Sequence, residues 1–127
     1  MVSGQKGQAV MKKIVEQGLL YDFYGELLTE HQKNIYEDAV YNDMSLSEIA
    51  EQYGISRQGV HDLIRRCDKL LAGYEEKLHL VRKFTEAKKT VAQIEKLAEE
   101  GRWMPEQACR EKLDEIRQLT SGLMENF

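Results

Sequence analysis

The chain has 127 residues, 42% of them hydrophobic and 31% charged, which is enough apolar material for one compact domain and leaves little for a second. A single proline and an abundance of Leu, Glu, Lys, Ala and Gln favour long helices and exclude a β-sheet of any size. The formal net charge is −4 and no segment is strongly basic, so we expect weak non-specific DNA affinity for one isolated copy.

The N-terminal part contains a stretch without a helical pattern followed by a helix. Residues 1–10 are rich in Gly and Gln, and we expect them to form a flexible N-terminal extension. From Met11 on, apolar side chains at helical spacing predict one helix, weakened at Gly18 and Gly25 by about 1 kcal/mol each. Its apolar stripe consists of Ile14, Leu20, Phe23, Tyr24 and Leu27.

A capping box predicts the second helix. In this motif the first side chain bonds the backbone N–H three residues on, and the later side chain reaches back to the first N–H. Thr29 with Gln32 has the pattern, so we expect a helix over residues 30–41, followed by turn residues at 42–43.

A second capping box, Ser45 with Glu48, begins a short helix over Leu46–Tyr53. The helix is predicted to end there because Gly54 stands where a left-handed residue closes a helix. Ser56 then caps a third helix.

The segment 45–71 fits a helix-turn-helix. Ala50 is small where the two helices cross, and Gly54 permits the sharp turn between them. The predicted motif core consists of Ile49, Ala50, Gly54, Ile55 and Val60.

The polar side of the third helix is the candidate nucleic-acid-binding surface. At about 100° per residue, its polar side chains fall opposite the apolar ones, and they offer an amide suited to adenine, guanidinium groups suited to guanine, and cations suited to phosphate. Asp62 on the same side argues against close phosphate approach. The candidate residues are Arg57, Gln58, His61, Arg65, Arg66 and Lys69.

The C-terminal part predicts a long helix and a helical hairpin. No proline occurs between Ser56 and Gly101, so the third helix can run long, and an apolar seam with coiled-coil spacing continues from Leu70 to Leu97 or Ala98. Residues 101–105 form a turn, and a last helix follows. The seam needs a partner, which is the last helix folded back, the same helix of a second chain, or both. The apolar stripe of the last helix is Ala108, Leu113, Ile116, Leu119 and Leu123.

Catalytic and metal-binding motifs are not recognisable, so we expect a protein that is not an enzyme and needs no cofactor or metal. Cys67 and Cys109 are too few for a disulfide scaffold, and no apolar run approaches the roughly 20 residues that span a bilayer. We therefore expect a reduced, cytoplasmic protein without membrane insertion.

Three segments together, residues 19–29, Ser45–Val60 and residues 74–80, resemble the YlxM-like family of bacterial helix-turn-helix proteins. The likeness extends from about Leu19 to the C-terminus, and the motif is also similar to the fourth region of sigma factors, which docks on promoter DNA. The resemblance implies a regulatory role in the signal recognition particle pathway, with the particle's GTPase or its RNA as partner. The chain departs from the family pattern at Gly59 and at residues 61–63, so the implied fold transfers more safely than any base specificity.

The predicted protein is all-α, a helix-turn-helix bundle without a wing, extended by a long C-terminal helix and a hairpin. We divide it into an extension at 1–10, a helical domain at 11–72 and a dimerising extension at 73–127. Three functions stay open: a nucleic-acid-binding regulator of the signal recognition particle pathway, an ordinary DNA-binding transcriptional regulator, and a helical protein-interaction module whose motif serves packing alone. A homodimer is expected in each case.

Overall fold

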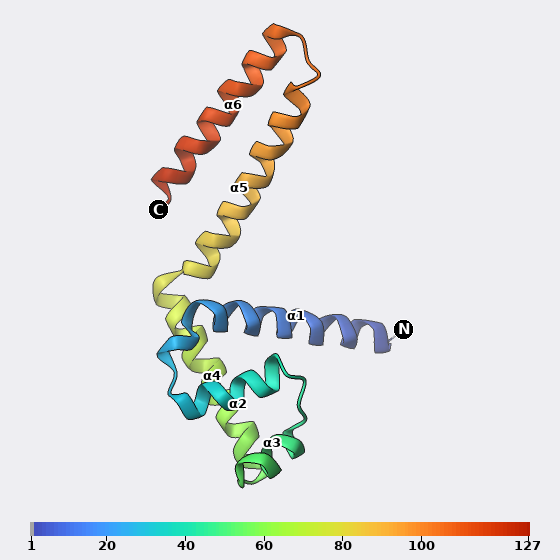
Figure 1. Ribbon diagram of the computed structural model, residues 1–127, viewed down its shortest axis with the longest axis vertical. Helices are drawn as coiled ribbons and strands as arrows, with labels where there is room; N and C mark the ends of the chain where they lie inside the picture. The colour runs from blue at the N-terminus through green and yellow to red at the C-terminus, as the bar shows by residue number, and fades with distance from the viewer. Residues whose placement is uncertain (1) are drawn as a thin grey trace. The chain divides into compact units, whose positions relative to one another are not determined.

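The computed structural model describes the backbone of residues 2–127 and the side chains of residues 12–127. Over that part of the chain all regular elements are helices (Figure 1), which confirms the all-α prediction. None of these helices is long and apolar enough to cross a membrane within the described residues. The elements are α1 Val2–Tyr24, the 3-10 turn η1 Gly25–Leu27, α2 Glu30–Val40, α3 Leu46–Tyr53, α4 Arg57–Leu78, α5 Leu80–Gly101 and α6 Glu106–Glu125.

Helix α1 is longer than its sequence pattern predicts. It begins at Val2 and continues through Gly18, so the backbone of residues 2–10 is helical, while the flexibility expected of this stretch stays a prediction. At Gly25 the chain turns into η1 beside the ring of Tyr21. A Cβ atom on residue 25 would lie 2.8 Å from that ring, so only glycine fits without displacing it.

Both predicted capping boxes are confirmed. The backbone N–H of Gln32 donates to Oγ1 of Thr29 at 3.2 Å, and the backbone N–H of Thr29 donates to Oε1 of Gln32 at 2.9 Å. The second box joins Ser45 and Glu48 in the same reciprocal way.

The chain separates into two compact units, Met1–His79 and Leu80–Phe127. The division proposed from sequence, after residue 72, falls inside α4. In the first unit, α4 contacts α1, α2 and α3, and a core forms where these helices meet. Its fully buried large side chains are Tyr24, Ile35, Tyr36, Ile49, Val60, Cys67 and Leu71.

Tyrosine hydroxyls connect the helices of the first unit. Tyr36 of α2 donates to Oδ1 of Asp68 on α4 at 2.6 Å, and Gln17 of α1 donates to the same oxygen at 2.9 Å. Tyr24 of α1 donates to Oε1 of Glu75 on α4 at 2.6 Å. Two residues of α4 therefore receive hydrogen bonds from the helices packed against it.

The third helix is long, but it does not continue along the whole predicted seam, because α4 ends at Leu78 and α5 begins at Leu80. His79 between them adopts a left-handed backbone with φ 56°, and its N–H donates to the carbonyl oxygen of Glu75 at 2.8 Å. This is the geometry that usually requires glycine at a helix end, and histidine is one of the few other residues that adopt it with some frequency. Neither a glycine nor a proline marks this helix end in the sequence around His79.

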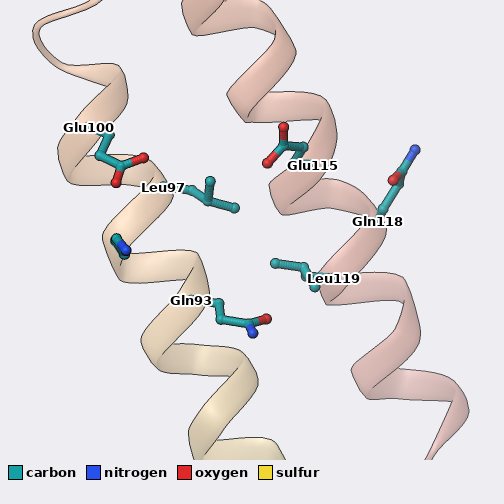
Figure 2. A pocket seen from close by; sticks show the side chains of 7 residues that line it. Gln93, Leu97, Glu100, Glu115, Gln118 and Leu119 are labelled. Atoms are coloured by element: carbon teal, nitrogen blue, oxygen red, sulfur yellow. The ribbon is translucent and has the colours of Figure 1, made fainter.

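The second unit is a hairpin in which α6 runs back along α5 (Figure 1), so the last helix is one partner of the predicted seam. The turn at residues 102–105 carries Trp103, which is 79% exposed, and Pro105 precedes α6. Leu97 of α5 and Leu119 of α6 point into the space between the two helices (Figure 2). Part of the predicted apolar stripes stays outside this contact, since Val91 and Leu113 are exposed.

Candidate nucleic-acid interface

The helix-turn-helix has the geometry that its sequence predicts. Helix α3 ends at Gly54, which has φ 67° in the left-handed region, and the N–H of Ile55 donates back to the carbonyl oxygen of Ala50 at 3.1 Å. Helix α4 begins directly after Ser56, whose Oγ accepts the N–H of Gly59 at 2.9 Å. The turn between the helices is thus fixed by a left-handed residue on one side and an N-cap on the other.

Four residues of the motif, Ile49, Ala50, Ile55 and Val60, lie in or against one apolar cluster, whereas Gly54 is exposed in the turn. Ile49 of α3, Val60 of α4 and Ile35 of α2 are fully buried and form one cluster. Ala50 and Ile55 are half-buried against it. Because α2 closes the third side of this cluster, α4 presents the opposite side to solvent.

All six candidate binding residues are exposed on α4. We call them the outer face: Arg57, Gln58, His61, Arg65, Arg66 and Lys69. They line two surface hollows. One, of about 480 Å³, is formed by Arg57, Gln58 and His61 together with Leu46, and the other, of about 350 Å³, by Arg65, Arg66 and Lys69 together with Asp62.

Asp62 occupies the middle of the outer face. Its Oδ1 accepts Nε2 of Gln58 at 3.0 Å and lies 3.7 Å from Nδ1 of His61. The amide of Gln58 therefore has to leave Asp62 before it can bond to an adenine edge. The contact is between exposed side chains, so exchanging it costs little.

The cations of the outer face have no ionic partner among the residues with described side chains. No ion pair there joins Arg57, Arg65, Arg66 or Lys69 to a carboxylate. Four positive charges are therefore available to phosphate oxygens.

The acidic residues Asp68 and Glu75 of α4 point away from the outer face. Asp68 accepts from Gln17 and Tyr36, and Glu75 accepts from Tyr24, all on the side of α4 that packs against α1 and α2. Counted along the sequence, residues 56–72 have four basic side chains against two acidic ones, Asp62 and Asp68. The structure makes the outer face more basic than that count, with Asp62 as its one carboxylate between residues 57 and 69.

Comparisons with known proteins agree with this architecture. A family model described as "Putative helix-turn-helix protein, YlxM / p13 like" matches residues 11–115. A UPF0122 protein of Desulforamulus reducens is 48% identical over 84 residues, which is 66% of this chain and 72% of the relative. UPF0122 proteins of Shouchella clausii and Bacillus cereus are 37% and 38% identical over 110 residues, covering 87% and 83% of this chain and 99% and 100% of the relatives. The chain therefore belongs to the YlxM/p13-like helix-turn-helix family.

Proposed function

We propose that the outer face of α4 binds nucleic acid and that the protein acts as a regulator through this contact. The observation that carries the proposal is the division of charge on α4: its cations lie together on the solvent side, while Asp68 and Glu75 are held by tyrosines on the packed side. In a helix-turn-helix the start of the second helix contacts the bases of the DNA major groove, in the way the fourth region of sigma factors does. Here that start carries Arg57, Gln58 and His61.

The family resemblance directs the proposal to the signal recognition particle pathway in the cytoplasm. The RNA and the GTPase of the particle are then the partners to test beside DNA. An A-form RNA helix has a major groove too deep and narrow for side chains to read, so on RNA the outer face would contact phosphates. Binding to an RNA helix should depend on salt and little on sequence, whereas DNA binding should depend on both.

A homodimer held by the C-terminal helices belongs to the same proposal. A second copy doubles the four cations that one outer face offers to a phosphate backbone. Such an increase matters for a chain whose formal net charge is −4.

The test measures binding of duplex DNA and of an RNA hairpin by fluorescence anisotropy at several salt concentrations. We expect the double variant Arg57→Ala/Arg65→Ala to bind about ten-fold more weakly and to lower the salt slope by about 2, one unit for each lost phosphate contact. Lys12→Ala/Lys13→Ala removes the same charge from the exposed side of α1 and serves as control. Equal affinities and slopes for both double variants would remove the outer face as the binding surface.

The GTPase is tested separately. Purified GTPase is titrated with this protein in the presence of nuclease, so that a bridging RNA is removed. Binding that survives nuclease and the Arg57→Ala/Arg65→Ala change would favour a protein-interaction module over a nucleic-acid-binding regulator.

A further inference from the structure

The second unit has very little interior of its own. Among residues 80–127, Gly101 is the one residue that is buried, and no large apolar side chain reaches that state. Two helices without a buried side chain are marginal in water, because packing of an apolar face supplies most of a helix's stability. Further packing on the hairpin of α5 and α6 would therefore add to its stability.

Helix α5 carries two apolar lines. One line, containing Ala87 and Ile94, is half-buried beside α6. The other contains Phe84, Val91 and Ala98, each seven residues apart. Nζ of Lys88 lies 5.5 Å from the centroid of the Phe84 ring, and 47% of Val91 is open to solvent. A seven-residue apolar repeat is the pattern of a helix that packs along a second helix.

Helix α6 has an exposed apolar line on the same side of the hairpin. Leu113 is 54% exposed, and Met124, eleven residues later, lies within about 20° of it around the helix axis. On each helix the exposed line lies roughly 70 to 100° ahead of the half-buried line, counted in the direction of the chain. In an antiparallel pair the same sense of rotation leads to the same face of the hairpin. The groove that Gln93 and Gln118 help to line (Figure 2) lies on the opposite face.

We call this exposed side the hairpin face, formed by Val91, Leu113 and Met124. Its charges are distributed unequally along α5. The half of α5 up to residue 90 carries four basic side chains and one acidic one, whereas the half from Val91 to Gly101 carries one basic side chain and three acidic ones. Two copies of α5 that run antiparallel therefore place opposite charges together, and two that run parallel place like charges together.

Lys88 and Glu95 flank the hairpin face on α5, and both are exposed. They are seven residues apart with Val91 between them. A two-fold axis that passes between the two α5 helices, level with Val91 and Ala92, brings Lys88 of each copy to Glu95 of the other, so the contact forms twice.

We propose that a second copy of this chain covers the hairpin face, with its α5 antiparallel to the first α5, and that the four helices form one bundle. The inference rests on the homodimer of the proposed function and adds its surface and orientation. The base of each hairpin, at Leu80, then lies beside the tip of the other.

Charge reversal in the full-length protein tests the orientation. Sedimentation velocity measures self-association of Lys88→Glu, of Glu95→Lys and of the double variant. We expect each single variant to associate at least ten-fold more weakly, because like charges meet at two symmetric positions, and the double variant to recover the original affinity. Circular dichroism verifies that all three keep their helices.

A distance measurement provides an independent readout. In a Cys109→Ser background, Arg102→Cys carries a spin label at the hairpin tip. Residue 102 lies about ten residues from the axis, so the antiparallel bundle separates the two labels by about 30 Å at 1.5 Å of rise per residue. A parallel bundle brings them within about 15 Å, and that result would overturn the proposal.

The remaining outcomes are equally decisive. A constant mass of 14.7 kDa at all concentrations, or a double variant as weak as the single ones, contradicts the antiparallel second copy. If the outer face does not bind nucleic acid, the proposed self-association is unaffected, since Arg57 and Arg65 lie in the first unit. Conversely, a monomer that still loses DNA affinity on Arg57→Ala/Arg65→Ala retains the proposed nucleic-acid binding and rejects this inference alone.

Discussion

Five tyrosines of the first unit donate their hydroxyls to carboxylates, and each bond joins residues at least fifteen positions apart. Two of them, Tyr24 with Glu75 and Tyr36 with Asp68, fasten α4 to the preceding helices. The others are Tyr21 with Glu37, Tyr41 with Asp22 and Tyr53 with Asp38. A hydrogen bond to a charged acceptor is stronger than one between neutral groups, so these pairs fix the angles between helices that apolar contacts leave adjustable.

Removing the hydroxyl of Tyr36 should destabilise the first unit. Tyr36→Phe keeps the fully buried ring and deprives Asp68 of one of its two donors, so we expect a loss of about 1 to 3 kcal/mol in urea unfolding. Tyr41→Phe is the matched control, because Tyr41 is 49% exposed and water can replace its hydroxyl beside Asp22. An equal decrease in the free energy of unfolding for both variants would mean that burial does not determine how much these hydrogen bonds stabilise the protein.

The same tyrosines predict unfolding at alkaline pH. Burial, followed by the bond to Asp68, raises the pKa of Tyr36, and burial followed by the bond to Asp22 raises the pKa of Tyr41 to about 12. The folded state thus keeps phenolic protons that the unfolded chain releases near its ordinary pKa of 10, so the stabilisation is complete below pH 10 and declines above it. Burial also raises the pKa of the Cys67 thiol to about 11, which acts in the same direction.

Urea unfolding between pH 8 and pH 11.5 measures this effect. Each tyrosine that ionises in the unfolded chain alone lowers the free energy of unfolding by about 1.4 kcal/mol per pH unit. Tyr36→Phe should make the alkaline decline shallower by about that amount. A decline of unchanged steepness would show that Tyr36 ionises equally in both states.

At the scale of single helices, two glycines should respond to alanine in opposite directions. Gly73 lies within α4, and an added Cβ atom there would meet nothing within 4 Å, so Gly73→Ala should stabilise the protein by about 0.5 to 1 kcal/mol. Gly25→Ala should destabilise it, because the Cβ atom would come within 2.8 Å of the Tyr21 ring. Thermal unfolding of both variants decides the matter, and a shift of the same sign in both would contradict it.

Helix boundaries were predictable from sequence where the signal is local. Each capping box, Thr29 with Gln32 and Ser45 with Glu48, joins residues only three positions apart. Gly54 ends α3 through its own left-handed backbone. These helix ends can therefore be recognised without tertiary information. The break at His79 was missed because histidine is not a reliable signal for a left-handed residue.

The exposed residues of the candidate interface were predictable for a similar reason. Helical periodicity alone separates Arg65 from Val60 around α4, and the structure places the two on opposite sides. The inward position of Asp68 was not predictable, because its donors Gln17 and Tyr36 lie 51 and 32 residues away along the chain. Long-range polar partners leave no periodic trace in a sequence.

At the scale of the whole chain, the family model extends over residues 11–115 and so covers parts of both units. The first unit contains every fully buried large side chain, and the second contributes exposed apolar lines on α5 and α6. The proposed nucleic-acid-binding surface and the proposed self-association surface therefore lie in separate units, and substitutions in one should leave the other measurable.

The unequal interiors of the two units have a consequence for hydrogen exchange. Backbone amides exchange with deuterium when local structure opens, and the rate follows the stability of each cooperative segment. Amides of α2 and α4 around Ile35 and Val60 should exchange slowly at any protein concentration, because their core belongs to one chain. If the proposed second copy packs on the hairpin, amides of residues 80–127 should exchange rapidly in dilute protein and slowly in concentrated protein. Exchange measured by mass spectrometry over a hundred-fold concentration range would reveal this dependence, and a hairpin equally protected throughout would show that α5 and α6 are stable as a pair.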